Sequence, residues 1–131
     1  MSGIFHVGGN EYDNFMGRYS TLLAPLFADF AGVGAGARAL DVGAGTGALT
    51  SALLARGASV AAVDPSPEFA AVLRERLPGL EVEEAPAESL PYGDGVFDVA
   101  LAQLVVAFMS DAPAAIAEMA RVARRVAVCM W

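Results

Sequence analysis

The chain has 131 residues, of which 56% are hydrophobic, and a formal net charge of −7 at pH 7, so we expect a single globular domain. The acidic charge disfavours nonspecific binding to DNA, RNA or anionic membranes, since all three are negatively charged. The single cysteine, Cys129, excludes an internal disulfide and a cysteine-rich metal site, and no apolar run reaches the roughly 18 residues that a membrane span needs.

These totals indicate a cytoplasmic protein. Residues 1–9 have no hydrophobic period and lack the charged and apolar regions of a signal peptide, so we expect a loose arm there. His6, the only histidine, lies in this arm, where a solvated role is favoured over catalysis. Residues 10–31 repeat apolar side chains every three or four positions, which predicts an amphipathic helix or two, with Pro25 as a break or a first-turn residue. We expect this segment to form a lid, and Arg18 within it is either solvated or an anion partner under the lid.

A glycine-rich stretch follows the expected first strand, residues 38–42, and precedes an expected helix over residues 47–56. Its glycines stand at alternate positions, Gly43, Gly45 and Gly47. Glycines accept positive φ and let a ligand approach the backbone closely, and the helix start beyond them suits an acidic group. Glycine spacing alone is a weak signal, but the strand before it and the helix after it are what a nucleotide-type site requires.

The second strand, residues 58–64, ends in Asp64, which can accept hydrogen bonds from both hydroxyls of a ribose lying across the glycine turn. These residues therefore predict a nucleoside-binding βαβ unit without deciding which nucleoside it binds. Ser66 is the expected N-cap of the next helix, with Pro67 in its first turn. That helix should end at Leu77.

The remaining elements continue the alternation of strand and helix. We expect a third strand at the sheet edge over residues 80–84, a fourth over 96–101, a helix from the N-cap Asp111 to about Val122, and a fifth strand over 125–131. Such alternation predicts a parallel sheet with right-handed crossovers.

Six segments together resemble one known family: 12–19, 40–47, 63–66, 87–92, 97–98 and 118–122. They are similar to those of the S-adenosylmethionine-dependent methyltransferases with a Rossmann-like fold, in the small-molecule branch of the ubiquinone and menaquinone biosynthesis type. The resemblance covers residues 11–131. It implies a three-layer α/β/α fold with parallel strand order 3-2-1-4-5, and methyl transfer from S-adenosylmethionine to a small-molecule acceptor.

The resemblance also assigns cofactor contacts. Around the amino-acid part of the cofactor it implies Asp41, Gly43, Ala44, Gly45 and Gly47. The other implied contacts are Asp64 with the ribose, Pro65 and Phe69 with one side of the adenine, Ala87 and Glu88 with its edge, Gln103 with the methionine carboxylate and methyl, and Arg18 and Tyr19 closing over the site. No convincing catalytic base is found, so no catalytic residue is named.

The chain departs from the family pattern in three places. Ala85-Pro86 stands where relatives often carry Gly-Asp, so the aspartate expected to bind the adenine amine is absent. Ala123-Arg-Arg125 replaces a Pro-Gly-Gly turn before the fifth strand. The sequence ends at Trp131, before the last two strands of the family sheet. An apolar fifth strand at an open edge predicts pairing with another chain or copy, hence a homo-oligomer.

Two alternatives stay open at this point. The stretch from Gly43 to Ala48 also satisfies the loose dinucleotide fingerprint of an NAD(P)-dependent oxidoreductase, although Asp41 would approach the pyrophosphate and no second domain follows. The chain could instead be a non-catalytic remnant that binds the cofactor or oligomerises.

Overall fold

The structure, a computed structural model, describes residues 9–130, with the side chains of residues 9–16 and 107 left out. The expected N-terminal arm with His6 falls on residues 1–8 and, like Trp131, lies outside the described residues, whereas Gly9 already belongs to the first helix. In chain order the elements are α1 Gly9–Phe30, β1 Arg38–Val42, α2 Ala48–Ala55, β2 Ser59–Asp64, α3 Pro67–Arg76, β3 Glu81–Glu84, β4 Phe97–Gln103, the 3₁₀ helix η2 Val106–Phe108, α4 Ala112–Val122 and β5 Ala123–Cys129.

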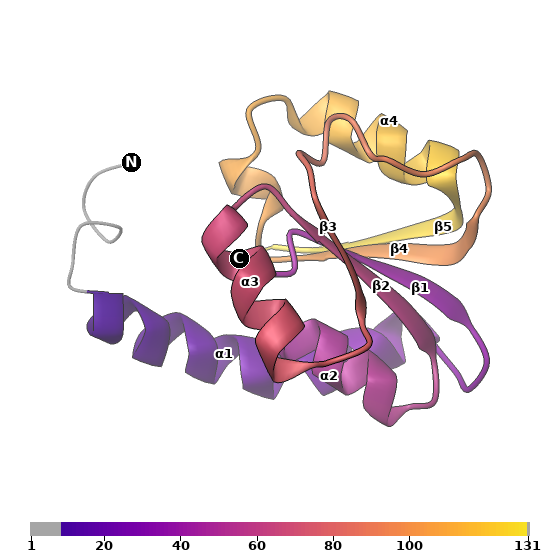
Figure 1. The fold of residues 1–131 in the computed structure, drawn as a ribbon. Coiled ribbons are helices and arrows are strands. Elements are labelled where there is room, and N and C mark those ends of the chain that lie inside the picture. The colour runs from indigo at the N-terminus through magenta and orange to yellow at the C-terminus, as the bar shows by residue number, and fades with distance from the viewer. Residues whose placement is uncertain (1–8, 131) are drawn as a thin grey trace.

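The five strands form one parallel sheet in the order β3-β2-β1-β4-β5, which confirms the predicted order. Helices α1, α2 and α3 cover one face of the sheet and α4 covers the other, so the molecule has three layers (Figure 1). Successive strand residues point to opposite faces. Ala39 accordingly packs in the cluster with α1 and α2, while the next residue, Leu40, packs in the cluster with Met119 of α4.

Helix α1 is a single helix that continues through Pro25, so the prediction of a break or a first-turn position there is wrong. Proline removes one backbone hydrogen bond, here to the carbonyl of Thr21. Pro25 and Thr21 are both exposed, so water can reach that carbonyl. On the C-terminal side of this gap, buried contacts of Phe27 and Ala28 with the sheet cluster hold the helix in place.

The predicted helix caps are confirmed. Ser66 Oγ accepts a hydrogen bond from the N–H of Phe69 at 3.2 Å, and Asp111 Oδ1 accepts one from the N–H of Ala114 at 3.1 Å. Strand β5 begins at Ala123, two residues earlier than predicted. The reason is that Ala123 ends α4, donating its N–H to Met119, and enters the strand without an intervening turn.

A polar cluster ties α4 to the loop before β4; we call it the Arg121 clasp. The guanidinium donates to the Glu118 carboxylate at 2.7 and 3.0 Å and to Asp94 Oδ1 at 2.9 Å. It also donates to the carbonyls of Tyr92 and Leu90 at 2.8 and 3.0 Å. These bonds hold the pKa of Glu118 down at about 2, chiefly through the hydrogen bonds from Arg121. The clasp fixes the loop that leads into β4, at the opposite end of that strand from the glycine turn.

Within residues 9–130, no helix is both long and apolar enough to cross a membrane.

Candidate functional site

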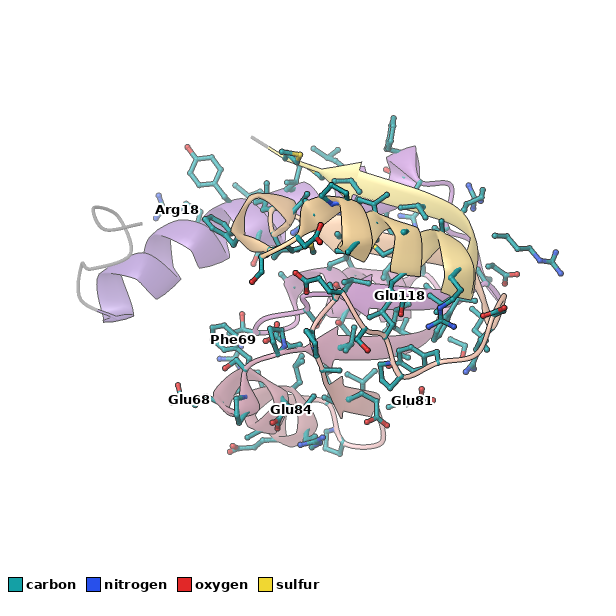
Figure 2. All side chains as sticks on the ribbon, turned by 90° about the horizontal axis from the view of Figure 1, so that it is seen from above. Arg18, Glu68, Phe69, Glu81, Glu84 and Glu118 are labelled. Atoms are coloured by element: carbon teal, nitrogen blue, oxygen red, sulfur yellow. The ribbon has the colours of Figure 1, made fainter. Side chains whose placement is uncertain are left out.

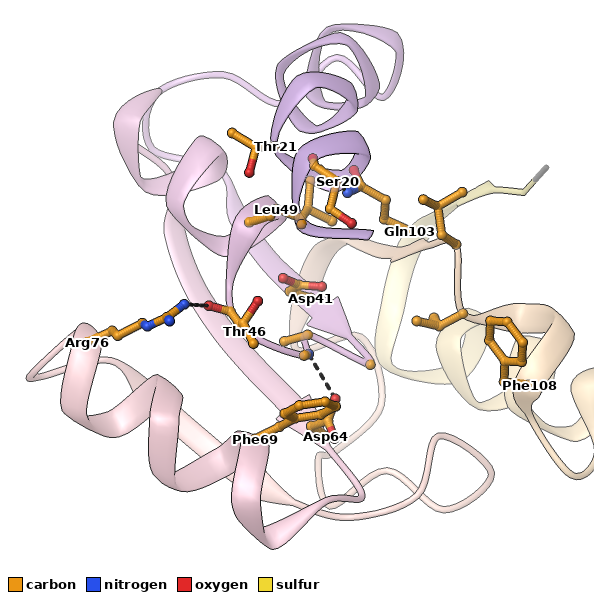
Figure 3. A pocket seen from close by; sticks show the side chains of 17 residues that line it. Ser20, Thr21, Asp41, Thr46, Leu49, Asp64, Phe69, Arg76, Gln103 and Phe108 are labelled. Atoms are coloured by element: carbon orange, nitrogen blue, oxygen red, sulfur yellow. Dashed lines mark hydrogen bonds between the residues drawn. The ribbon is translucent and has the colours of Figure 1, made fainter. Parts of the chain in front are cut away.

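A cavity of about 470 Å³ lies at the carboxyl ends of β1, β2 and β4, beside α1 (Figure 3). This end of a parallel sheet is where α/β folds bind ligands, at the point where the strand order reverses. Seven of the residues that the sequence assigned to the cofactor border the cavity: Asp41, Gly43, Ala44, Gly45, Asp64, Phe69 and Gln103.

Two positions of the turn require glycine, because a side chain there would clash with a neighbour and would have to adopt a positive φ. Gly43 has φ 71°, and a Cβ added there would lie 2.9 Å from Cγ2 of Val105. Gly47 has φ 96°, and a Cβ added there would lie 2.9 Å from Cδ2 of Leu73. Gly47 is also the N-cap of α2 and offers no side-chain cap, so the first turn of α2 keeps N–H groups for other partners.

Asp64 fastens the glycine turn to the end of β2. Its side chain is buried, with Oδ2 accepting from the N–H of Gly45 and Oδ1 from the N–H of Ser66, both at 2.9 Å. A carboxylate has about four lone-pair sites, so two acceptor positions remain after these bonds. Figure 3 shows Asp64 beneath Phe69, a residue that is 38% exposed.

Asp41 lies below the same turn and is only 2% exposed. Its Oδ2 accepts a hydrogen bond from the Thr50 hydroxyl at 2.6 Å. Burial raises the pKa of Asp41 from 3.8 to about 7, against the lowering effect of the Thr50 hydrogen bond, and the charge of Asp64 adds to the increase. Near neutral pH this carboxyl therefore holds its proton part of the time and becomes an anion when a cation approaches.

Gln103 connects the end of β4 to α1. Its Nε2 donates to the carbonyl of Ser20 at 3.2 Å, while its Oε1 is buried and has no partner among the described residues. A buried acceptor without a partner is costly, which marks this position for a ligand donor or water. Gln103 thus brings a free carbonyl oxygen to the cavity wall.

The other six predicted contacts do not border the cavity: Arg18, Tyr19, Gly47, Pro65, Ala87 and Glu88. Glu88 instead accepts from the N–H of Asp111 at 3.0 Å. Arg18 is exposed on the outer half of α1 (Figure 2), and Tyr19 is 46% exposed. Their roles toward a cofactor remain predictions.

Other wall residues were not assigned to the cofactor in the sequence. Ser20 and Thr21 come from α1, Leu104 and Val105 follow β4, and Arg76 reaches the carbonyl of Thr46 with its Nη1 at 3.3 Å. A polar pair inside an apolar helix was the available signal for Ser20 and Thr21. The residues after β4 carried no such signal, because they are as apolar as the core.

Comparisons with known protein sequences find methyltransferases. Residues 40–130 match a family model described as a methyltransferase domain. An uncharacterized methyltransferase of Mycobacterium tuberculosis is 45% identical over 87 residues, which are 66% of this chain and 35% of that protein.

Solved structures extend the likeness to the fold. An S-adenosylmethionine-dependent methyltransferase of Thermotoga maritima superposes with a TM-score of 0.69 at 29% identity, covering 94% of this chain and 56% of that one. The cyclase SpnF superposes with a TM-score of 0.71 at 31% identity, covering 79% and 40%. The chain spans only 35% to 39% of the length of the curated relatives that it matches.

Proposed function

Since the chain belongs to the family of S-adenosylmethionine-dependent methyltransferases with a Rossmann-like fold, we propose that it binds S-adenosylmethionine in the cavity at the glycine turn and transfers its methyl group to a small molecule. The observation that supports this most is the joint presence of the glycine turn, Asp41 and Asp64 on one cavity wall. The same membership disfavours the oxidoreductase alternative.

The wall residues fit the chemical groups of this cofactor. The turn from Gly43 to Gly45 offers backbone with almost no side chain, as an amino-acid moiety at close range requires. Asp64 keeps acceptor sites for ribose hydroxyls, and the half-exposed ring of Phe69 offers an apolar surface for a purine. Asp41 and the free Oε1 of Gln103 are both able to accept from an ammonium group.

S-adenosylmethionine, when bound, supplies an electrophilic methyl group on a sulfonium that is already a good leaving group. The chain's own residues then have to hold the acceptor in line with that methyl and exclude water, and such positioning can provide several kcal/mol of rate enhancement. A general base is needed only where the acceptor must lose a proton. We assign no residue to that role.

We further propose that the acceptor is a small molecule entering between α1 and η2, where Ser20, Thr21 and Phe108 border the cavity. The net charge of −7 and the acidic edge formed by Glu68, Glu81 and Glu84 (Figure 2) support the absence of a nucleic-acid partner. A cytoplasmic location rests on the same composition and on the single cysteine.

The outer edge of β5 supports a proposal of self-association. No strand among residues 9–130 pairs with that edge, and an apolar groove between α1 and β5 lies beside it, lined by Leu26, Phe30 and Met130. We propose that a second copy covers this edge. Sedimentation equilibrium tests the idea, and a monodisperse monomer whose β5 amides exchange freely would contradict it.

The cofactor assignment is tested by calorimetric titration of the chain with S-adenosylhomocysteine and, separately, with NAD. We expect S-adenosylhomocysteine to bind, and Asp64→Ala to weaken it by about tenfold or more, equivalent to about 1.4 kcal/mol. Glu83→Ala is the matched control, because it removes an exposed carboxylate from β3 outside the cavity wall.

Each outcome has a separate meaning. Binding that weakens only in Asp64→Ala supports the proposal and leaves the acceptor to be found by following S-adenosylhomocysteine release. Binding of NAD alone overturns the proposed cofactor. Binding of neither ligand favours a remnant that keeps the fold without the site.

A further inference from the structure

The backbone of Leu104 has an unusual conformation. Its φ is 62°, the only positive value at a non-glycine residue in the described part of the chain. L-residues rarely adopt this region, because the side chain crowds the backbone, and such residues concentrate at functional sites. Leu104 is also buried, at 6% exposed, and borders the cavity at the end of β4. The fold therefore keeps a strained leucine where a glycine would fit without strain.

The left-handed residue redirects the chain at the point where β4 ends. Its own N–H donates to the carbonyl of Cys129 at 2.7 Å, which holds the turn to β5. An extended residue at this position would continue the strand and send Val105 away from the glycine turn, because strand residues alternate between faces.

The two neighbours of Leu104 touch opposite walls of the cavity. Val105 lies against Gly43, so closely that a Cβ there would be 2.9 to 3.3 Å from three of its side-chain atoms. Gln103 reaches α1 through its bond to the carbonyl of Ser20. One residue's backbone conformation thus sets the positions of two wall residues and joins the glycine turn, α1 and β5.

We propose that Leu104 is a positioning residue, whose left-handed backbone holds Val105 against the glycine turn and Gln103 against α1 and so shapes the cavity for its ligand. The inference rests on the proposed function only for the identity of that ligand. The bracing of the glycine turn is a property of the chain alone and has its own measurement.

Two substitutions separate the backbone from the side chain. Leu104→Ala removes most of the side chain and keeps the strain, whereas Leu104→Gly removes the same packing and the strain together. Urea unfolding and calorimetric titration with S-adenosylhomocysteine are measured on both variants and the parent chain. We expect Leu104→Gly to unfold at a higher urea concentration than Leu104→Ala and to bind about fivefold more tightly, because glycine keeps the left-handed backbone that fixes the wall whereas alanine favours leaving it.

The difference in affinity between two variants that lack the same side chain is the diagnostic result. A merely structural role would change the stability of the two variants and leave them with equal affinity for S-adenosylhomocysteine. That outcome would overturn the proposal.

Amide hydrogen exchange of the ligand-free protein provides the second measurement. Gly43 and Ala44 both donate to the carbonyl of Val63, at 2.8 and 3.1 Å. We expect these two amides to exchange several times faster in Leu104→Ala than in Leu104→Gly, since alanine favours leaving the left-handed region and then releases Val105 from the turn. Equal exchange overturns the inference. A parent chain that binds no S-adenosylhomocysteine contradicts the proposed function instead, while the exchange rates still decide the role of Leu104.

Discussion

The cavity and the Arg121 clasp use polar groups in opposite ways. In the clasp the guanidinium is bonded to two carboxylates and two carbonyls, and Glu118 accepts the N–H of Leu90 as well. In the cavity the Asp41 carboxyl accepts hydrogen bonds from Thr50, Gln103 Oε1 has no partner among the described residues, and α2 begins without a side-chain cap. Polar groups whose hydrogen bonds are satisfied hold a loop in place. Polar groups that lack partners are available to a ligand, but they cost the folded chain stability. The number of hydrogen-bond partners thus distinguishes the clasp, which holds the loop before β4, from the cavity, which we propose binds a ligand.

The two regions should respond oppositely to pH, and Asp41 gives the larger effect. Its folded pKa of about 7 lies above its ordinary value of 3.8, so the folded chain holds a proton that the unfolded chain releases between these values. The contribution of Asp41 to the free energy of unfolding is therefore complete below pH 4 and is lost as the pH rises through 7, a change on the order of 4 kcal/mol in all. Urea unfolding from pH 4 to pH 8 should show this fall in the parent chain relative to Asp41→Asn. A constant difference between the two proteins would contradict the pKa.

Gly43→Ala should be the next largest change. The new Cβ meets Val105 and must adopt φ 71°, so we expect a loss of about 3 kcal/mol in the free energy of unfolding. Gly45→Ala is the matched control, because Gly45 also has a positive φ, 57°, but nothing lies within 4 Å of an added Cβ. Thermal unfolding of both should place Gly43→Ala lower by the cost of the clash. Equal losses would mean that Val105 yields easily.

The clasp should give the smallest effect, with the reverse sign. The pKa of Glu118 is lowered to about 2, so its stabilisation is complete above pH 4.5 and is lost as pH falls through 2. The pair is partly exposed, which limits the effect to about 1 kcal/mol or less. Glu118→Gln, compared with the parent chain by urea unfolding at pH 3 and pH 7, should be less stable at pH 7, and the difference should be smaller at pH 3. Affinity for S-adenosylhomocysteine should stay unchanged, since Glu118 lies outside the cavity wall.

The features that sequence predicted are local ones. The caps Ser66 and Asp111 and the glycine turn follow from short patterns, and the parallel sheet follows from the alternation of strand and helix. The strand order followed from the family resemblance. The features it missed depend on contacts between distant segments, such as the bond from Gln103 to Ser20 across 83 positions. Leu104 is the extreme case, because a leucine in the sequence does not indicate a left-handed backbone. The direction of Glu88 toward Asp111 was hidden for the same reason.

Pro25 leaves α1 with one missing backbone hydrogen bond, at a place that we call the seam. The carbonyl of Thr21 lacks its helical partner there, and Thr21 borders the cavity. Beyond the seam Phe27 and Ala28 are anchored in the core, while the helix before it extends past the body of the molecule (Figure 1). A rod that is one bond short bends most easily at that place. Ser20 and Thr21 of the cavity wall lie on the N-terminal side of Pro25, so a bend at this place would move them relative to the rest of the cavity.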